Sequence, residues 1–275
     1  MATTPIIEVL TAPVTRLLTL TSVVREDYGI GSDATDSYLS RLIKRNSASV
    51  ENFCNRVFAR QRIQESILIL ADAYPYQLPG GVSPLQLSYW PLIEVESVYE
   101  FGKELSSEKY RALSSRGQLV RLDYTGNPMA WPTTEIVVIY SAGYELPLPD
   151  WEADTAYSIG DVVVNDACIY SATVAGTSAS SGGPTGTDSS ITDGTVTWSY
   201  VRAYERTLPY DIEDAVGRLV FSRYLARRRD PFIKSETTEG VGSVSYIVGD
   251  PTGEGANFPP DVMDLLNNYR VPVVR

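Results

Sequence analysis

Hydrophobic residues recur at steps of three and four between Asp33 and Phe58, and this spacing predicts an amphipathic helix. Asp33 is the expected N-cap, because its carboxylate can accept hydrogen bonds from the first free amides of a helix. The same spacing returns after Pro209 and again after Pro260, so two further helices are expected. The three apolar stripes contain Leu39, Leu42, Ile43, Val50, Phe53, Cys54 and Val57, then Ile212, Ala215, Val216, Leu219 and Val220, and finally Val262, Leu265 and Leu266.

Between residues 62 and 144 the period shortens to two, or to compact runs of β-branched residues, and this pattern is typical of strands. Turn signals rich in Gly and Pro separate the runs. We expect a small antiparallel sheet whose strands are Ile63–Leu70, Leu85–Tyr89, Ile93–Tyr99, Gln118–Leu122 and Ile136–Tyr140.

Residues 151–201 differ from the rest of the chain in charge and composition. This window holds six acidic residues and no Lys or Arg, and 22 of its 51 residues are Ser, Thr or Gly. No helical period survives in it, so a separate small β module is predicted. The expected domains are residues 1–149 (a long helix over 33–58 and the sheet over 62–144), an inserted module over 150–206, and a second part of the first domain over 207–275. The predicted fold class is therefore α+β, with helices, a small antiparallel sheet and an inserted all-β module.

The charge balance and the missing histidines exclude several classes of function. The 275 residues carry a formal charge of −11 and contain no His. A net acidic chain is poorly suited to grip nucleic acid through its phosphates, and without imidazole no Ser-His-Asp relay and no His metal site can form. Only Cys54 and Cys168 remain, so two free thiols are expected.

The N-terminal residues have no basic segment followed by an apolar run, so no signal peptide is expected. No uncharged apolar run reaches about 18 residues, and no membrane span is predicted. The sequence also lacks a nucleophile elbow and a phosphate-binding loop, and Gly240-Val241-Gly242 lacks the third glycine of a dinucleotide site. We therefore predict a protein that is not an enzyme and uses no cofactor and no metal.

Two sets of neighbouring carboxylates are candidate catalytic groups. Glu94 and Glu96 share a strand face, and Asp211 lies close to Glu213 and Asp214 at a helix start. A solvated strand face and a helix N-terminus that attracts acids explain both pairs better than glycoside hydrolysis does. The acids of the module do not follow the spacing of a calcium-binding loop.

Aromatic residues of the module allow two interpretations. Trp151, Tyr157, Tyr170 and Trp198 stand in a segment of small polar residues. Flat aromatic faces can stack on sugar rings, which makes them candidate carbohydrate-binding residues. A module this small also has few other residues from which to build a core, and we favour that interpretation.

Arg227, Arg228 and Arg229 follow the second helix. Such a run can contact DNA phosphates or a neighbouring subunit, and it can equally complement the negative end of the helix dipole.

Outside the module the chain resembles the head-to-tail connector (adaptor) proteins of tailed bacteriophages. The resemblance covers about four fifths of the chain and rests on the succession of its stretches rather than on any single one. They are Glu51–Phe58, Tyr89–Val98, Ile139–Tyr144, Leu208–Val216, Gly242–Tyr246 and Leu265–Arg270.

The module resembles chitin-binding-like β modules of carbohydrate-active enzymes, on Trp151, Thr155–Val163, Ile169–Ala172, Gly176–Ser178 and Asp193–Trp198. It interrupts the connector pattern between Pro149 and Leu208. An insertion whose two ends lie close together leaves the host fold intact.

The first resemblance implies a helical adaptor core and a structural role in the virion neck, assembled in the cytoplasm of the bacterial host. The expected partners are other copies in a dodecameric ring, the portal protein, the next tail or neck protein, and DNA passing through the bore without sequence-specific binding. The residues that would bind the portal are Phe258, Leu266, Tyr269, Arg270, Val271 and Val273. A second contact arm, to the tail or to a neighbouring subunit, would contain Ser243, Val244, Tyr246 and Val248 and could add a strand to a partner's sheet.

The acidic balance fits such a ring, because twelve chains would carry about −130 in total and acids along a bore would repel phosphate. The alternative function is adsorption to a host through surface glycan, with the module binding carbohydrate and the rest serving as an anchor.

Overall fold

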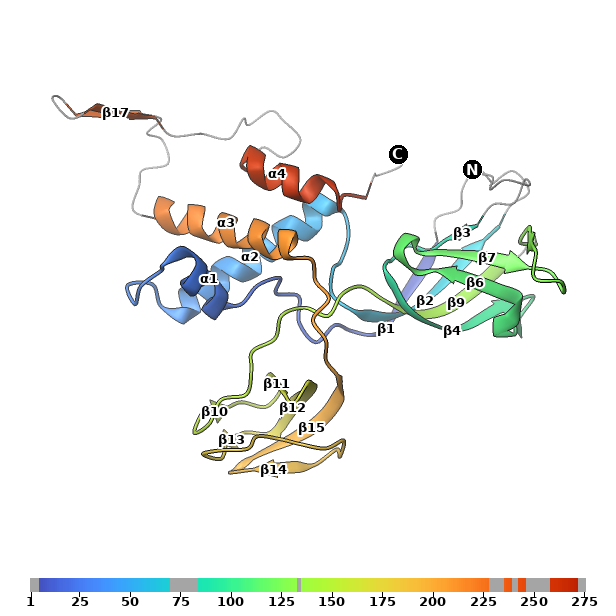
Figure 1. Cartoon of the computed structure of the whole chain (residues 1–275), viewed down its shortest axis with the longest axis horizontal. Helices are drawn as coiled ribbons and strands as arrows, with labels where there is room; N and C mark the ends of the chain where they lie inside the picture. The colour runs from blue at the N-terminus through green and yellow to red at the C-terminus, as the bar shows by residue number, and fades with distance from the viewer. Residues whose placement is uncertain are drawn as a thin grey trace. The chain divides into compact units, whose positions relative to one another are not determined.

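The computed structural model describes residues 5–69, 84–132, 135–227, 235–238, 242–245 and 258–271, the two four-residue segments by backbone only. The chain divides into two compact units, and its segments alternate between them. Residues 1–15 and 57–144 form unit 1, and residues 16–56 and 145–275 form unit 2. Figure 1 shows the helices and strands with the labels used below.

Unit 1 is built from two antiparallel sheets. The first has the order β1-β2-β9-β4-β5, with β1 (Ile6–Thr11), β2 (Gln61–Leu68), β9 (Glu135–Ala142), β4 (Leu92–Glu100) and β5 (Lys103–Glu104). The second has the order β3-β7-β6, and β8 also pairs with β7. Its strands are β3 (Leu85–Gln86), β6 (Tyr110–Leu113), β7 (Gln118–Leu122) and β8 (Pro128–Met129), with the short 3₁₀ turns Ser107–Lys109 and Ser114–Arg116 on either side of β6.

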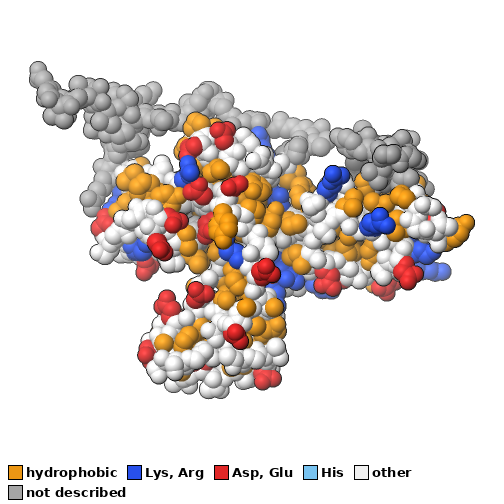
Figure 2. All heavy atoms as spheres, viewed as in Figure 1, with side chains coloured by type: hydrophobic (Ala, Val, Ile, Leu, Met, Phe, Trp, Pro, Cys, Tyr) orange, Lys and Arg blue, Asp and Glu red, His pale blue; other side chains and the backbone are white. Residues whose placement is uncertain are grey.

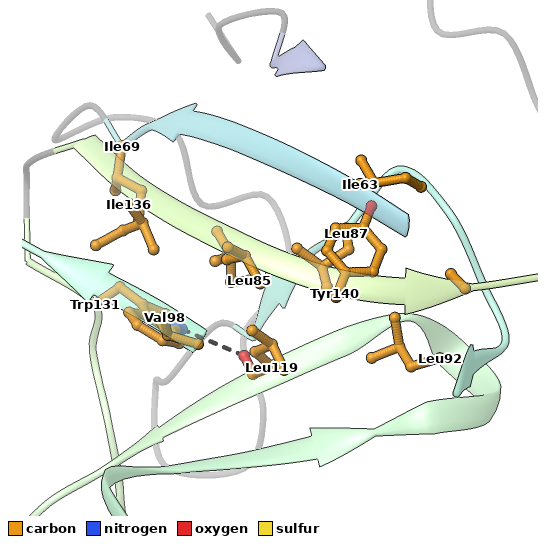
Figure 3. Close-up of a cluster of buried hydrophobic side chains, with 12 residues drawn as sticks. Ile63, Ile69, Leu85, Leu87, Leu92, Val98, Leu119, Trp131, Ile136 and Tyr140 are labelled. Carbon is orange, nitrogen blue, oxygen red and sulfur yellow. Dashed lines mark hydrogen bonds between the residues drawn. The ribbon is translucent and has the colours of Figure 1, made fainter. Parts of the chain in front are cut away.

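Apolar side chains from both sheets form the core of unit 1. Figure 3 shows that Ile63 of β2, Leu87, Leu119 of β7, and Ile136 and Tyr140 of β9 converge on one interior. The Trp131 Nε1 donates to the Leu119 carbonyl at 3.3 Å, so its one polar group is satisfied inside the core.

A carboxylate is buried in this core and fully supplied with donors. Glu65 Oε2 accepts from the Tyr140 hydroxyl at 2.5 Å and from the Ser88 amide at 3.0 Å, and Oε1 accepts from the Ser88 hydroxyl at 2.6 Å. Burial and the neighbouring Glu65 raise the pKa of Tyr140, which therefore stays a hydrogen-bond donor. The buried Glu65 carboxylate therefore belongs to a structural hydrogen-bond network.

Unit 2 contains the helices α1 (Thr21–Tyr28), α2 (Asp36–Cys54), α3 (Tyr210–Ala226) and α4 (Pro260–Asn267). Their apolar faces are buried, with Leu39, Val50, Ile212, Val216 and Leu266 fully or almost fully covered. Pro260 occupies the first position of α4, where its missing amide costs nothing. Strands β16 (Ser235–Thr238) and β17 (Gly242–Ser245) pair with each other as an antiparallel two-stranded sheet.

The predicted module also lies in unit 2 and consists of short antiparallel strands. Its main sheet has the order β11-β12-β15-β14, and β10 pairs with β13. The strands are β10 (Ala156–Tyr157), β11 (Val162–Asn165), β12 (Cys168–Val174), β13 (Gly176–Thr177), β14 (Ile191–Asp193) and β15 (Val196–Ala203).

The mixed α+β class is confirmed, although strands outnumber helices in the described parts of the chain. The helices after Pro209 and at Pro260 are confirmed, as are antiparallel strands between residues 61 and 142. These strands belong to two sheets rather than the one that was expected.

The predicted limits of the first helix were wrong. Thr35, not Asp33, is the N-cap of α2, and its side chain accepts from the Tyr38 amide at 3.3 Å. Asp33 instead accepts a hydrogen bond from the Tyr224 hydroxyl. The helix ends at Cys54 rather than Phe58, because Asn55 adopts a left-handed conformation with φ of 50°.

Candidate functional site

The C-terminal segment that was predicted to bind a portal is folded against the helices of unit 2. Phe258 packs edge-on against Phe53 near the end of α2, with ring centroids 5.1 Å apart. The Arg270 guanidinium lies over the same Phe53 ring, 5.2 Å from its centroid. The Val271 amide donates to the Cys54 carbonyl at 2.9 Å, which ties the last described residue to the C-terminus of α2.

These contacts divide the predicted portal-binding residues into two groups. Leu266 is fully buried in unit 2, so its side chain offers no surface to a partner. Phe258, Tyr269 and Val271 are half-buried and Arg270 is exposed. Val273 lies outside the described residues.

Burial of this region also affects the thiol of Cys54. Its pKa is raised to about 12 because the side chain is buried, and its Sγ lies 3.9 Å from the Leu266 carbonyl oxygen. Both Cys54 and Cys168 are free cysteines, as expected.

The predicted contact arm coincides in part with the two-stranded sheet of β16 and β17. Ser243 and Val244 lie on β17, where Val244 pairs with Glu236 and Ser243 with Thr237 of β16. Tyr246 and Val248 lie outside the described residues.

Arg227 serves a local role. Its guanidinium forms an ion pair with Asp33 and lies over the Tyr224 ring, 4.1 Å from the centroid. It therefore joins the end of α3 to the loop before α2. Arg228 and Arg229 lie outside the described residues.

The four aromatic residues of the module are core residues. Trp198 is fully buried and Tyr170 is 1% exposed, while Trp151 and Tyr157 are half-buried and pack against the same cluster. Tyr157 meets Trp198 edge to face, with centroids 4.9 Å apart. The core interpretation holds for Tyr170 and Trp198, whose buried rings present no face on which a sugar could stack.

A single carboxylate organises this aromatic core. Asp193 Oδ2 accepts from the Nε1 atoms of Trp151 at 2.8 Å and Trp198 at 3.0 Å, and its Oδ1 accepts from the Ala179 amide at 2.9 Å. Sequence reasoning did not find this role, because nothing in the order of residues indicates that two distant indoles share one acceptor.

The other acids of the module are on its surface. Glu152, Asp154, Asp161, Asp166 and Asp188 are all exposed. The lower lobe in Figure 2 accordingly presents acidic and no basic side chains on the visible face.

Three of the paired carboxylates, Glu96, Glu213 and Asp214, are engaged in ion pairs. Glu96 accepts from Arg62 at 2.6 Å, and these hydrogen bonds lower the pKa of Glu96. Burial raises the pKa of Glu213, which pairs with Arg206. Asp214 and Asp261 both pair with Arg218, while Glu94 and Asp211 are exposed. The carboxylates thus fit structural roles.

Within the described ranges, no group of three acidic or cysteine residues is close enough to hold a metal ion. No helix in those ranges is long and apolar enough to cross a membrane.

Exposed apolar side chains are the surface feature that sequence reasoning missed. The most exposed aromatics are Tyr124 and Tyr210, and Phe101 is 68% exposed at a hairpin turn. The strand β1 exposes Ile6, Ile7 and Val9 together. The run Ile6-Ile7-Glu8-Val9-Leu10 was a signal for such a strand, but its lack of strict alternation hid it.

No protein-family model matches the chain, and no curated protein sequence matches it. The chain is similar to two solved structures, each at 12% identity with a TM-score of 0.43, over 98% of this chain and 97% of the other. One is described as the neck of an empty gene transfer agent particle computed with C6 symmetry, and the other as the virion of a native gene transfer agent particle.

Proposed function

We propose that the chain is a structural subunit of the neck of a tailed phage. Copies would form a closed, dodecameric ring between the portal and the tail, and DNA would pass through the bore. The observation that carries this proposal is that stretches resembling the connector family, far apart in the sequence, meet one another in the fold.

Three of these stretches meet in unit 2. Phe53 belongs to the stretch Glu51–Phe58 and packs against Phe258 and Arg270, the latter in the stretch Leu265–Arg270. The Tyr269 hydroxyl donates to Asp211 Oδ2 at 3.3 Å, which adds the stretch Leu208–Val216. In this proposal the stretches that resemble the connector family are therefore those that hold the C-terminal segment in place.

Two other stretches meet in unit 1. Strand β4 pairs with β9 so that Leu92 faces Ala142, and the Gly143 amide donates to the Pro91 carbonyl at 3.0 Å. Gly143 has a φ of 109°, and a Cβ there would lie 2.5 Å from the Ala59 carbonyl oxygen, so only glycine fits this position. The glycine of the stretch Ile139–Tyr144 is therefore needed for the close approach of this segment to the backbone of Phe58 and Ala59.

The contacts that hold residues 258–271 against α2 suggest how a portal would be bound. Residues up to Val271 are secured to α2, so the residues that follow would start from a defined point on the subunit. In this proposal Pro272–Arg275, which include Val273, supply the portal contact together with the exposed Arg270 and the half-buried Phe258 and Tyr269.

The charge of the chain supports free passage of DNA. A formal charge of −11 in every subunit disfavours tight binding to phosphates wherever acids line the bore. The module, with its buried aromatic residues, is assigned the role of a spacer or decoration on the ring.

The test combines the purified chain with its portal protein and counts subunits by native mass spectrometry and electron microscopy. We expect a closed ring that binds the portal. A variant lacking residues 272–275 should form the ring and lose portal binding, whereas Leu225→Ala, a change at an exposed position on α3, should retain both. A chain that stays monomeric with and without portal would contradict the proposal.

A further inference from the structure

Strand β1 has a free edge. It pairs with β2 from Ile6 opposite Ser66 to Thr11 opposite Arg62, and it is the terminal strand of the five-stranded sheet. Among the described residues no strand pairs with its other side. The amides and carbonyls on that side are therefore available to an added strand.

The side chains of this edge are unusually apolar for a surface. Ile6 is 73% exposed, Val9 47% and Ile7 39%. Soluble proteins protect such edges with lysines, prolines or very short strands. Within β1 the only charged residue is Glu8, and the one irregularity is a register shift between Val9 and Thr11, so Ile6–Val9 form a regular and mostly apolar edge.

The pairing register of β1 with β2 shows that some side chains of β1 lie on the side of the sheet that faces the core. Ile7 lies opposite Glu65 and Val9 opposite Ile63, and both partners are fully buried. Residues opposite each other in an antiparallel pair point to the same side of the sheet. Ile7 and Val9 therefore lie on the core side, at a rim that β1 leaves open to solvent.

The same chain contains a strand that lacks a partner on one side. Strands β16 and β17 pair only with each other in the described part of the chain, as a two-stranded sheet. A sheet of two strands is marginally stable in water and gains from a third. Strand β17, Gly242–Ser245, has no charged residue, whereas β16 contains Glu236. Pairing through β17 therefore keeps Glu236 one strand away from Glu8 and avoids opposing like charges.

We propose that β1 is the acceptor edge of the subunit interface, and that β17 of a neighbouring copy adds to it as a further strand. The contact joins two different surfaces of the chain, so it is heterologous and can be repeated around a closed ring. This inference rests on the self-assembly proposed above and names the strands that make it.

The first test places lysine on the edge. The double variant Ile6→Lys/Val9→Lys should raise the concentration needed for assembly by about tenfold or more, because each interface would then bury two charges at an edge. Ile93→Lys is the matched control, since Ile93 is 42% exposed on β4, which two strands, β2 and β9, separate from β1. Sedimentation velocity measures assembly, and far-ultraviolet circular dichroism checks that all variants fold.

The second test identifies the partner strand. In a Cys168→Ser background, Glu8→Cys and Ser243→Cys are made in separate chains, mixed, and treated with a short bismaleimide. Cys54, whose side chain is buried, should remain unmodified. A cross-linked dimer that forms only in the mixture supports the inference, because one cysteine must come from each copy.

The outcomes separate the two proposals. Assembly of the wild-type chain without a mixed cross-link, or with equal effects of Ile6→Lys/Val9→Lys and Ile93→Lys, would overturn the β1–β17 contact and leave the ring intact. A wild-type chain that never assembles, even beside the portal, would overturn both.

Discussion

Phe101 is a residue whose backbone conformation is unfavourable for its side chain. It forms the two-residue turn between β4 and β5 with Gly102, and both have positive φ values of 55° and 70°. Turns of this kind favour Asn or Gly at the first position, because a β-carbon is strained in the left-handed region. The exposed ring of Phe101 gains little burial to offset that strain.

We therefore predict that Phe101→Asn stabilises unit 1 by about 1 kcal/mol, since asparagine tolerates the left-handed conformation. Phe101→Ala is the control, because alanine removes the same exposed ring but keeps the strain. Urea denaturation gives the free energy of unfolding of each variant. Equal stability of the Asn and Ala variants would show that the turn conformation is not the cause.

Asp193 gives a second prediction at the scale of a single side chain. Asp193→Ala removes the acceptor of two indole N–H groups and one amide, and leaves these donors in a mostly buried site. Each orphaned donor costs about 1 kcal/mol or more, so the module should lose about 3 kcal/mol.

The control is Asp188→Ala, an acid on the surface of the same module. Thermal unfolding followed by tryptophan fluorescence compares the two. A module equally stable in both variants would mean that Asp193 is not its organising group.

At the scale of elements, α2 tests which residue begins the helix. Thr35→Ala should cost about 1 kcal/mol, because the side-chain acceptor for the Tyr38 amide is lost. Hydrogen exchange of the first-turn amides should accelerate. Asp33→Ala should leave these amides protected and instead loosen the end of α3, which Tyr224 and Arg227 attach to Asp33. Faster exchange of the first turn in Asp33→Ala would contradict this assignment.

The elements that could be predicted from the sequence are those with one buried face and one exposed face. The stripes of α2, α3 and α4 and the alternation in β2 and β9 follow from one buried face in each case. Strand β1 exposes both faces, and α1 buries only Val24, so neither produced a clear period. The N-cap was misplaced because Asp33 and Thr35 are both suitable caps, and only the contact with Tyr224 separates them.

The candidate site shows the same limit. The sequence identified the aromatic residues of the module and the apolar residues of the C-terminal segment. Whether Trp198 or Leu266 faces a partner or the interior depends on packing between residues far apart in the chain, which no local pattern records. The roles of Asp193 and Cys54 depend on neighbours of that kind as well.

At the scale of the whole molecule, the two ends of the module are joined to each other. The Glu145 amide donates to Thr207 Oγ1 at 2.9 Å, and the Thr207 and Leu208 amides donate to the Glu145 carbonyl at 3.2 Å. Arg202 holds Glu145 through two hydrogen bonds at 2.7 and 2.9 Å. The chain thus enters and leaves the module at nearly one point, and an insertion with ends so close together is well tolerated.

This geometry predicts that the module can be removed without unfolding the rest. A variant in which an Asn-Gly turn replaces residues 148–204 keeps the Glu145–Thr207 pairing and the ion pair between Arg206 and Glu213, so α3 should still begin at Tyr210. The loss of the Arg202 contact should cost at most a few kcal/mol, because Glu145 gains solvent once the module is gone. If the module is a spacer or decoration, the shortened chain should assemble and bind portal like the full chain, as measured by native mass spectrometry.

A matched variant that replaces residues 140–204 also removes Glu145 and the end of β9, and should not fold. A shortened chain that folds but no longer assembles would mean that the module itself forms part of the contact between subunits.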